Sequence, residues 1–259
     1  MLAVSAMLPP HITDNPPVIL VHGSVNAASV WTFWQPALAD GGWASYAIDL
    51  RGHGRSAALD LSGTGMQDYA ADVRALALQF KRPPVIIGWS MGGLVAMMVA
   101  ADGVASACVA LAPSAPARHR NPDMILRTGE FGPEEYGIQD RNPEHQRAMP
   151  DLHRDERVIA LNALGKESRL ARDERQAGIV IESIGCPCLI VTGSADTQWP
   201  RERYRHLWLK ADYLSVEGAS HWGLVLNRRA LESMIPAVLR WLAGALRPSP
   251  RVGTTDERR

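Results

Sequence analysis

A serine flanked by small residues lies between two apolar runs, in the segment Gly88-Trp89-Ser90-Met91-Gly92-Gly93. Residues 84–87 before it predict a buried strand, and residues 94–100 after it predict a helix. In a Gly-x-Ser-x-Gly turn of this kind, the glycines let strand and helix approach closely and leave the serine at the tip. The unpaired N–H groups at the start of the helix would stabilise an oxyanion beside Ser90. The segment predicts a nucleophilic serine; the alternative is a glycine-rich turn without chemistry.

A serine hydroxyl is a weak nucleophile unless a base takes its proton, and that base needs a third group to orient it. His221 follows the last expected strand, and Asp196 follows the strand before it. Because the carboxyl ends of parallel strands meet at one edge of a sheet, these residues and Ser90 are expected at the same edge. The sequence therefore offers a nucleophile (Ser90), a base (His221) and an orienting carboxylate (Asp196).

Other titratable residues compete for these roles less well. Asp212 and Glu217 precede His221 too closely to come from another strand end. His22 and His53 belong to loop motifs in which a histidine usually bonds the backbone. We keep all four as alternatives to the expected acid and base.

The elements that must position these residues alternate along the chain. Residues 66–80 space their apolar side chains by three and four, which predicts an amphipathic helix against a sheet. Strands separated by helices and short connections predict an α/β fold with a doubly wound, mostly parallel sheet. Apolar runs that predict strands lie at 17–21, 43–50, 84–87, 107–112, from 187 onward, and at 213–216.

The composition changes at Pro113, where the buried strands stop and arginines and acidic residues become frequent. Capping residues predict four short helices, starting near Asn121, Asn142, Asp155 and Ser168. We therefore expect a small helical lid between two core strands. Its arginines either recognise an acidic substrate or form a solvated surface. The expected organisation is residues 1–113 as the first part of the core, 114–180 as the lid, 181–246 as the second part of the core, and 247–259 as a disordered tail.

Length and composition are those of a globular protein. The 259 residues suit one α/β domain with an insertion, and 46% are hydrophobic against 21% charged. The 27 basic residues equal the 27 acidic ones, so nothing in the charge suggests nucleic acid or an anionic membrane. No apolar run has the length of a membrane span or the form of a signal peptide, so we expect a cytoplasmic protein.

The three cysteines, Cys108, Cys186 and Cys188, are too few for a disulfide framework and have no histidine pair at zinc spacing nearby. Buried thiols are therefore expected, and no metal site is predicted.

Four tryptophans lie close in sequence to the expected site. They could wall an apolar pocket for the acyl or alcohol part of a substrate, and ordinary core packing explains each of them equally well. These residues are Trp31, Trp89, Trp199 and Trp222.

Taken together, the motifs give the chain a family resemblance over residues 17–245. It resembles the α/β-hydrolase superfamily, in its lidded serine esterase, lactonase and C–C hydrolase branch. The resemblance implies Ser90 as nucleophile, His221 as general base and then acid, and Asp196 as its orienting carboxylate. It also implies an oxyanion hole from the backbone N–H groups of Met91 and Ser24, with Val25 as the register alternative to Ser24. The motifs are His22-Gly23, Asp49-x-Arg51-Gly52-x-Gly54-x-Ser56, Gly88-x-Ser90-x-Gly92-Gly93, Gly193-x-x-Asp196 and His221.

We expect a serine hydrolase that cleaves small-molecule carboxylic esters through an acyl-enzyme, with no cofactor. A lactonase, a C–C bond hydrolase, a hydroxynitrile-type lyase or a cofactor-free peroxidase would be compatible with the same residues. A small-molecule receptor that retains the triad is a further alternative. Epoxide hydrolases and haloalkane dehalogenases are disfavoured, because those relatives carry aspartate at the position of Ser90. The sequence leaves the substrate and the oligomeric state open.

Overall fold

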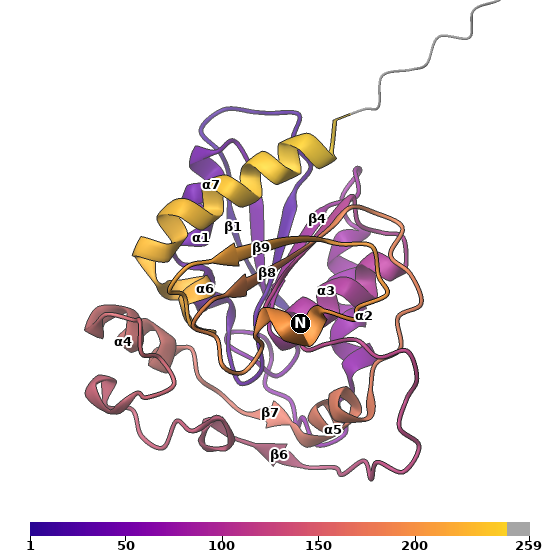
Figure 1. The fold of residues 1–259 in the computed structure, drawn as a ribbon, viewed down its shortest axis with the longest axis vertical. Helices are drawn as coiled ribbons and strands as arrows, with labels where there is room; N and C mark the ends of the chain where they lie inside the picture. Colours follow the sequence, from indigo (N-terminus) through magenta and orange to yellow (C-terminus); the bar gives the residue numbers. More distant parts are fainter. Residues whose placement is uncertain (248–259) are drawn as a thin grey trace, which may run out of the picture.

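Seven strands form one sheet in a computed structural model that describes residues 1–247 (Figure 1). Their order is β1-β3-β2-β4-β5-β8-β9, and every neighbouring pair is parallel except the edge pair β1 and β3. The predicted α/β fold with a mostly parallel sheet is therefore confirmed. The strands are β1 (Ala3–Met7), β2 (Val18–Val21), β3 (Ser45–Asp49), β4 (Val85–Trp89), β5 (Ala107–Leu111), β8 (Cys188–Gly193) and β9 (Asp212–Val216).

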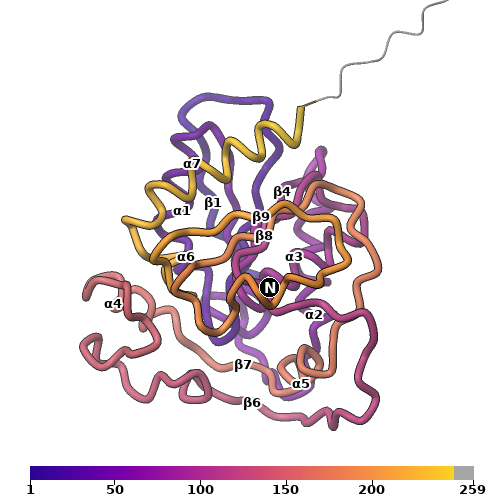
Figure 2. Tube along the Cα trace, viewed as in Figure 1, coloured from indigo at the N-terminus to yellow at the C-terminus, as the bar shows by residue number. Residues whose placement is uncertain are grey.

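Helices cover both faces of the sheet (Figures 1 and 2). On one face α1 (Trp34–Asp40) and α7 (Arg228–Ala245) pack over a core that includes Val18 and Leu20 of β2. On the other face α2 (Met66–Ala77) and α3 (Met91–Ala101) pack over Ile19 and Val21. Because successive strand residues point to opposite faces and both faces are buried, β2 is an unbroken apolar run.

Shorter helices lie in the connections at the carboxyl ends of the strands. They are η1 (Ala28–Trp31), η4 (Arg201–Tyr204) and α6 (Gly223–Leu226).

The segment between β5 and β8 leaves the sheet and lies below it in the view of Figure 1. We call residues 114–180 the insertion. Its elements are β6 (Glu130–Phe131), η2 (Pro133–Tyr136), η3 (Pro143–His145), α4 (Arg154–Asn162), β7 (Glu167–Ser168) and α5 (Arg169–Ala177).

Only two of the four helices expected in the insertion are α-helices. The helix expected near Asp155 is α4, and α5 begins after Ser168, whose hydroxyl accepts the N–H of Ala171 at 3.2 Å. The helix expected near Asn142 is the 3-10 turn η3.

The prediction of a helix after Asn121 was wrong, because residues 121–129 contain no helix. Ile125, one of three consecutive apolar residues in this segment, is 77% exposed. Arg127 instead donates its backbone N–H and its guanidinium to Asp173 of α5. A tertiary ion pair therefore replaces the local helical hydrogen bonds that the capping residues indicated.

Two further expectations concern the C-terminal tail and membrane-spanning helices. The disordered tail expected at 247–259 lies outside the described residues, apart from Arg247. Within residues 1–247, no helix combines the length and the apolar character that crossing a membrane requires.

The turn between β4 and α3 depends on two glycines. A Cβ on Gly88 would lie 2.0 Å from the carbonyl oxygen of Gly92, and a Cβ on Gly92 would lie 2.3 Å from the carbonyl oxygen of His22. These contacts are with backbone, which cannot move without shifting the strand or the helix. Both positions therefore require glycine.

We predict that Gly88→Ala lowers the free energy of unfolding by about 3 kcal/mol or more, because the added methyl group overpacks the turn against backbone. Urea denaturation followed by circular dichroism measures this loss. The matched control is Gly244→Ala in α7, where a Cβ meets nothing within 4 Å and alanine favours the helix. Equal stability of the Gly88→Ala variant and the wild type would contradict the packing described here.

Candidate active site

Ser90 occupies the sharp turn between β4 and α3 with φ 57° and ψ −118°. Residues other than glycine rarely adopt such a backbone conformation, so the surrounding structure must hold Ser90 in it. The N–H of Ser90 donates to the carbonyl of Leu111 at 2.9 Å, and its carbonyl accepts from the N–H of Ser114 at 3.1 Å. The turn therefore fixes Ser90 at the carboxyl edge of the sheet, where its side chain lines a cavity of about 330 Å³.

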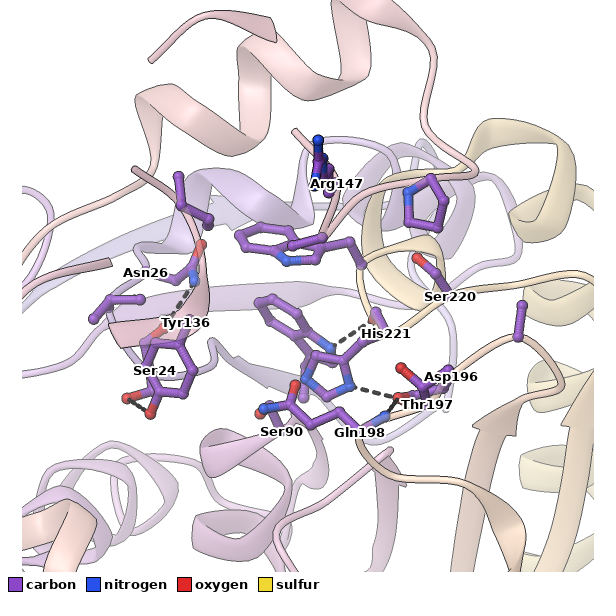
Figure 3. Close-up of a pocket in the computed structure, with 17 residues that line it drawn as sticks. Ser24, Asn26, Ser90, Tyr136, Arg147, Asp196, Thr197, Gln198, Ser220 and His221 are labelled. Carbon is purple, nitrogen blue, oxygen red and sulfur yellow. Dashed lines mark hydrogen bonds and ion pairs between the residues drawn. The ribbon is translucent and has the colours of Figure 1, made fainter. Parts of the chain in front are cut away.

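His221 and Asp196 form a hydrogen-bonded pair in the same cavity. His221 Nδ1 lies 2.8 Å from Asp196 Oδ2, and Asp196 Oδ1 accepts the N–H groups of Gln198 and Trp199 at 2.8 and 2.9 Å. Burial alone would raise the pKa of Asp196, but its hydrogen bond to His221, the charge of His221 and the two N–H groups lower it. An ionised carboxylate only accepts hydrogen bonds, so we assign the donated proton to Nδ1 of His221. Figure 3 shows the imidazole between Asp196 and Ser90.

Trp89 and Trp222 form one wall of the cavity. The indole N–H of Trp89 donates to the carbonyl of His221 at 3.0 Å, and the rings of Trp89 and Trp222 lie 4.9 Å apart. The other two tryptophans expected in the pocket do not line it. Trp31 is fully buried in the core with its ring edge-on to Trp34, and Trp199 is half-buried outside the cavity. Core packing therefore accounts for Trp31.

The backbone N–H groups expected to form an oxyanion hole differ in availability. Within residues 1–247, the N–H groups of Ser24 and Met91 donate to no protein acceptor. The N–H of Val25 donates to the carboxylate of Glu167 at 3.3 Å. Of the two register alternatives, only the N–H of Ser24 is therefore without a protein acceptor in the described residues.

The alternative acids and bases lie in other environments. His22 is fully buried, donates from Nδ1 to the carbonyl of Gly23 at 2.8 Å and accepts the N–H of Leu50 at Nε2. Burial and then the charge of His53 lower the pKa of His22 to about 4. Asp212 is exposed and accepts the indole N–H of Trp241. These contacts leave His22 and Asp212 with structural roles.

Glu167 of β7 is a fully buried carboxylate that the sequence pattern did not indicate. Its Oε2 lies 3.5 Å from His53 Nε2, and its Oε1 accepts the hydroxyl of Tyr69 at 2.5 Å. His53 Nδ1 donates to the carbonyl of Arg51 at 2.9 Å, which leaves Nε2 to face the carboxylate. Burial alone would raise the pKa of Glu167 and lower that of His53. Their mutual attraction instead lowers the pKa of Glu167 to about 2 and raises that of His53.

Several polar side chains in the cavity were also missed from the sequence. Asn26, Tyr136, Arg147 and Gln198 line it, and they come from three separate parts of the chain. No spacing rule connects them to Ser90, and the available signals were the closeness of Asn26 to the His22-Gly23 motif and of Gln198 to Asp196. Loops assembled by the fold therefore provide most of the polar lining.

Within residues 1–247, no cluster of histidine, cysteine, aspartate or glutamate side chains is arranged to hold a metal ion. All three cysteines are free thiols; Cys108 and Cys188 are buried, and Cys186 is half-buried.

Comparison with known sequences gives one family and a group of esterases. Residues 18–232 match the sequence model of the alpha/beta hydrolase family. A pimeloyl-[acyl-carrier protein] methyl ester esterase of Neisseria meningitidis serogroup C is 30% identical over 243 residues, which cover 84% of this chain and 91% of that protein.

Solved structures share the fold at low sequence identity. A monoacylglycerol lipase of Paleococcus ferrophilus superposes with a TM-score of 0.64 and 18% identity, covering 95% of this chain and 99% of that one. A thermophilic esterase of Thermogutta terrifontis gives a TM-score of 0.66 and 20% identity, covering 93% of each chain.

The buried Glu167 predicts an acid-sensitive contribution to stability. A carboxyl whose pKa is lower in the folded chain stabilises the fold above its unfolded pKa, and this stabilisation is lost as the pH falls toward the folded pKa. For Glu167 that window runs from 4.5 down to about 2. As the pH falls through this range, the unfolding free energy of the wild type should decrease more steeply than that of Glu167→Gln. The two slopes should differ by at most about 1.4 kcal/mol per pH unit.

Urea denaturation at a series of pH values measures both slopes. Identical slopes for the wild type and Glu167→Gln would mean that Glu167 titrates normally in the folded protein.

Proposed function

The chain belongs to the alpha/beta hydrolase family and is a carboxylic ester hydrolase, and we propose that Ser90, His221 and Asp196 form its catalytic triad. The observation that carries the proposal is the 2.8 Å hydrogen bond between His221 and Asp196 in a cavity that Ser90 also lines. Because Nδ1 donates to the carboxylate, Nε2 is the ring nitrogen that takes the proton of Ser90.

In the first half of the reaction, Ser90 Oγ bonds to the carbonyl carbon of the ester while its proton moves to His221 Nε2. Asp196 stabilises the imidazolium that forms. The tetrahedral intermediate then loses its alkoxide, which takes the proton from His221 and leaves as the alcohol. The acyl group remains on Ser90.

In the second half, water replaces the alcohol. The water oxygen bonds to the acyl carbon while His221 takes a proton from the water. The same proton moves to Ser90 Oγ when the bond between the acyl carbon and Oγ breaks. The free acid leaves, and the starting state of the three side chains is restored.

The oxyanion of both tetrahedral intermediates is assigned to the N–H groups of Met91 and Ser24. Met91 is the first residue of α3, so its N–H has no partner within the helix and lies at the positive end of the helix dipole. The engaged N–H of Val25 supports Ser24 as the second donor. Two backbone donors fixed before charge develops stabilise the intermediate at no cost of reorganisation.

We assign the insertion the role of a lid. Five residues of the insertion line the cavity, namely Tyr136, Ile138, Arg147, Ala148 and Pro150. A cover of this kind excludes water from the developing charges and gives the acyl group its shape-specific contacts.

The substrate class follows from the size of the cavity and from the relatives. A volume of about 330 Å³, walled by Trp89 and Trp222, suits an ester with a short or flexible acyl group. The curated relatives are named as methyl ester esterases, so methyl esters are the first substrates to assay. Lactones and vinylogous diketones in the same panel would identify a lactonase or a C–C hydrolase. Turnover slower than about once per minute with tight binding would identify a receptor.

We predict that Ser90→Ala lowers kcat for a nitrophenyl ester by roughly 10⁴- to 10⁶-fold, because the variant lacks the hydroxyl on which the proposed acyl-enzyme forms. A fluorophosphonate probe, which reacts with activated serines, should label the wild type and leave the variant unlabelled.

Ser106→Ala is the matched control, since Ser106 lies before β5 at the opposite edge of the sheet. It should retain wild-type labelling and kcat. Undiminished labelling or hydrolysis by Ser90→Ala would show that the nucleophile has been misassigned.

A further inference from the structure

We propose that Glu167 is a positioning residue for ester hydrolysis: its carboxylate, supplied by the insertion, holds the Ser24–Val25 turn so that the Ser24 N–H faces the substrate oxygen. The proposal rests on the proposed function, because it takes Ser24 as an oxyanion donor. Glu167 is fully buried and does not line the cavity, so it acts through the turn without touching the substrate.

The backbone of Val25 is strained and is held by the insertion. Its φ is +56°, a left-handed conformation that is rare for a β-branched residue. The N–H of Val25 donates to Glu167 Oε2 at 3.3 Å, and its carbonyl accepts the N–H of Gly165 at 2.8 Å. A strained conformation persists only when surrounding contacts over-determine it, and here both polar groups of the strained residue are bound by residues 165–167.

The side chain of Ser24 is held by the same part of the molecule. Its hydroxyl donates to Glu167 Oε2 at 3.0 Å, and it lies 3.1 Å from the hydroxyl of Tyr136 and 3.4 Å from Arg175 Nη2. All three partners belong to the insertion. These contacts fix the side chain of Ser24, while its backbone N–H donates to no protein acceptor within residues 1–247.

Glu167 is itself immobilised by the core. Its Oε1 accepts the hydroxyl of Tyr69 in α2 and, at 2.7 Å, the N–H of Ser168, while His53 faces Oε2. The carboxylate therefore connects the turn to two elements of the core. Both oxygens of the Glu167 carboxylate accept hydrogen bonds. A glutamine could not replace Glu167, because its amide nitrogen would take the place of one of these oxygens and face hydrogen-bond donors.

The electrostatic effect of Glu167 has the opposite sign to the positional one. A carboxylate close to the oxyanion hole repels the charge that develops there, so its removal by itself would speed the reaction. The guanidinium of Arg175 and the imidazole of His53 offset that repulsion. Loss of the charge alone would raise kcat, whereas loss of the positioning contact would lower it. A lower kcat on removal of the carboxylate therefore indicates the positional effect.

The test compares Glu167→Gln with the wild type on a nitrophenyl ester. We expect kcat to fall about 10- to 100-fold, less than or comparable to the loss of one oxyanion donor, with KM nearly unchanged. Affinity for a trifluoromethyl ketone, whose adduct with a serine carries an oxyanion, should fall in parallel.

Rescue distinguishes positioning from a general loss of packing. Glycine adopts positive φ readily, so Val25→Gly in the Glu167→Gln background should recover part of kcat and of the ketone affinity. An unchanged kcat in Glu167→Gln, or a loss that Val25→Gly leaves uncorrected, would overturn the proposal.

Glu156→Gln is the matched control. Glu156 is the other fully buried glutamate of the insertion, and it binds Arg228 and the N–H of His153 instead of the Ser24 turn. This variant should lose stability while its folded fraction keeps the wild-type kcat.

If Glu167→Gln does not fold, Ser24→Ala provides the second variant. It removes the hydroxyl that Glu167 holds and keeps the backbone donor, so a loss of kcat and ketone affinity is again expected; wild-type values would overturn the proposal. Hydrolysis by Ser90→Ala would instead refute the proposed function. An inactive Ser90→Ala together with a fully active Glu167→Gln would refute only the role of Glu167.

Discussion

The strained backbone of Ser90 is the constraint on which the rest of the site depends. At φ 57° and ψ −118°, the turn needs glycine at positions 88 and 92, because a side chain at either would collide with backbone. Those two glycines in turn let α3 start directly behind the hydroxyl, with the free N–H of Met91 beside it. One local conformation therefore positions both the hydroxyl of the proposed nucleophile and half of the proposed oxyanion hole.

A second strained residue, Val25, also lines the cavity and is supported differently. Hydrogen bonds to Leu111 and Ser114, at and just after the end of β5, hold the Ser90 turn, whereas Glu167 and Gly165 hold Val25. The insertion also binds the loop that carries the imidazole, since Asp151 Oδ2 accepts the N–H of Ser220 at 2.9 Å. The insertion therefore contributes to the geometry of the site on both sides and does more than cover it.

The sequence predicted the parts of the molecule that follow from local rules. Buried apolar runs predicted the parallel sheet, and the carboxyl ends of its strands predicted that Ser90, Asp196 and His221 would share one edge. Capping residues were less reliable in the insertion: residues 121–129 carry a cap but form no helix, because a tertiary ion pair competes for their backbone. Glu167 was not predictable, since its burial depends on partners in α2 and after β3 that are distant in sequence.

The most direct test of the central claim is a crystal structure of the protein with a trifluoromethyl ketone bound. The account predicts a covalent bond from the carbonyl carbon to Ser90 Oγ, with the oxygen about 2.7–3.1 Å from the N–H groups of both Met91 and Ser24. His221 Nε2 should lie within hydrogen-bonding distance of Oγ. An adduct on another residue, or an oxygen bound by Val25 N–H with Ser24 turned away, would contradict it.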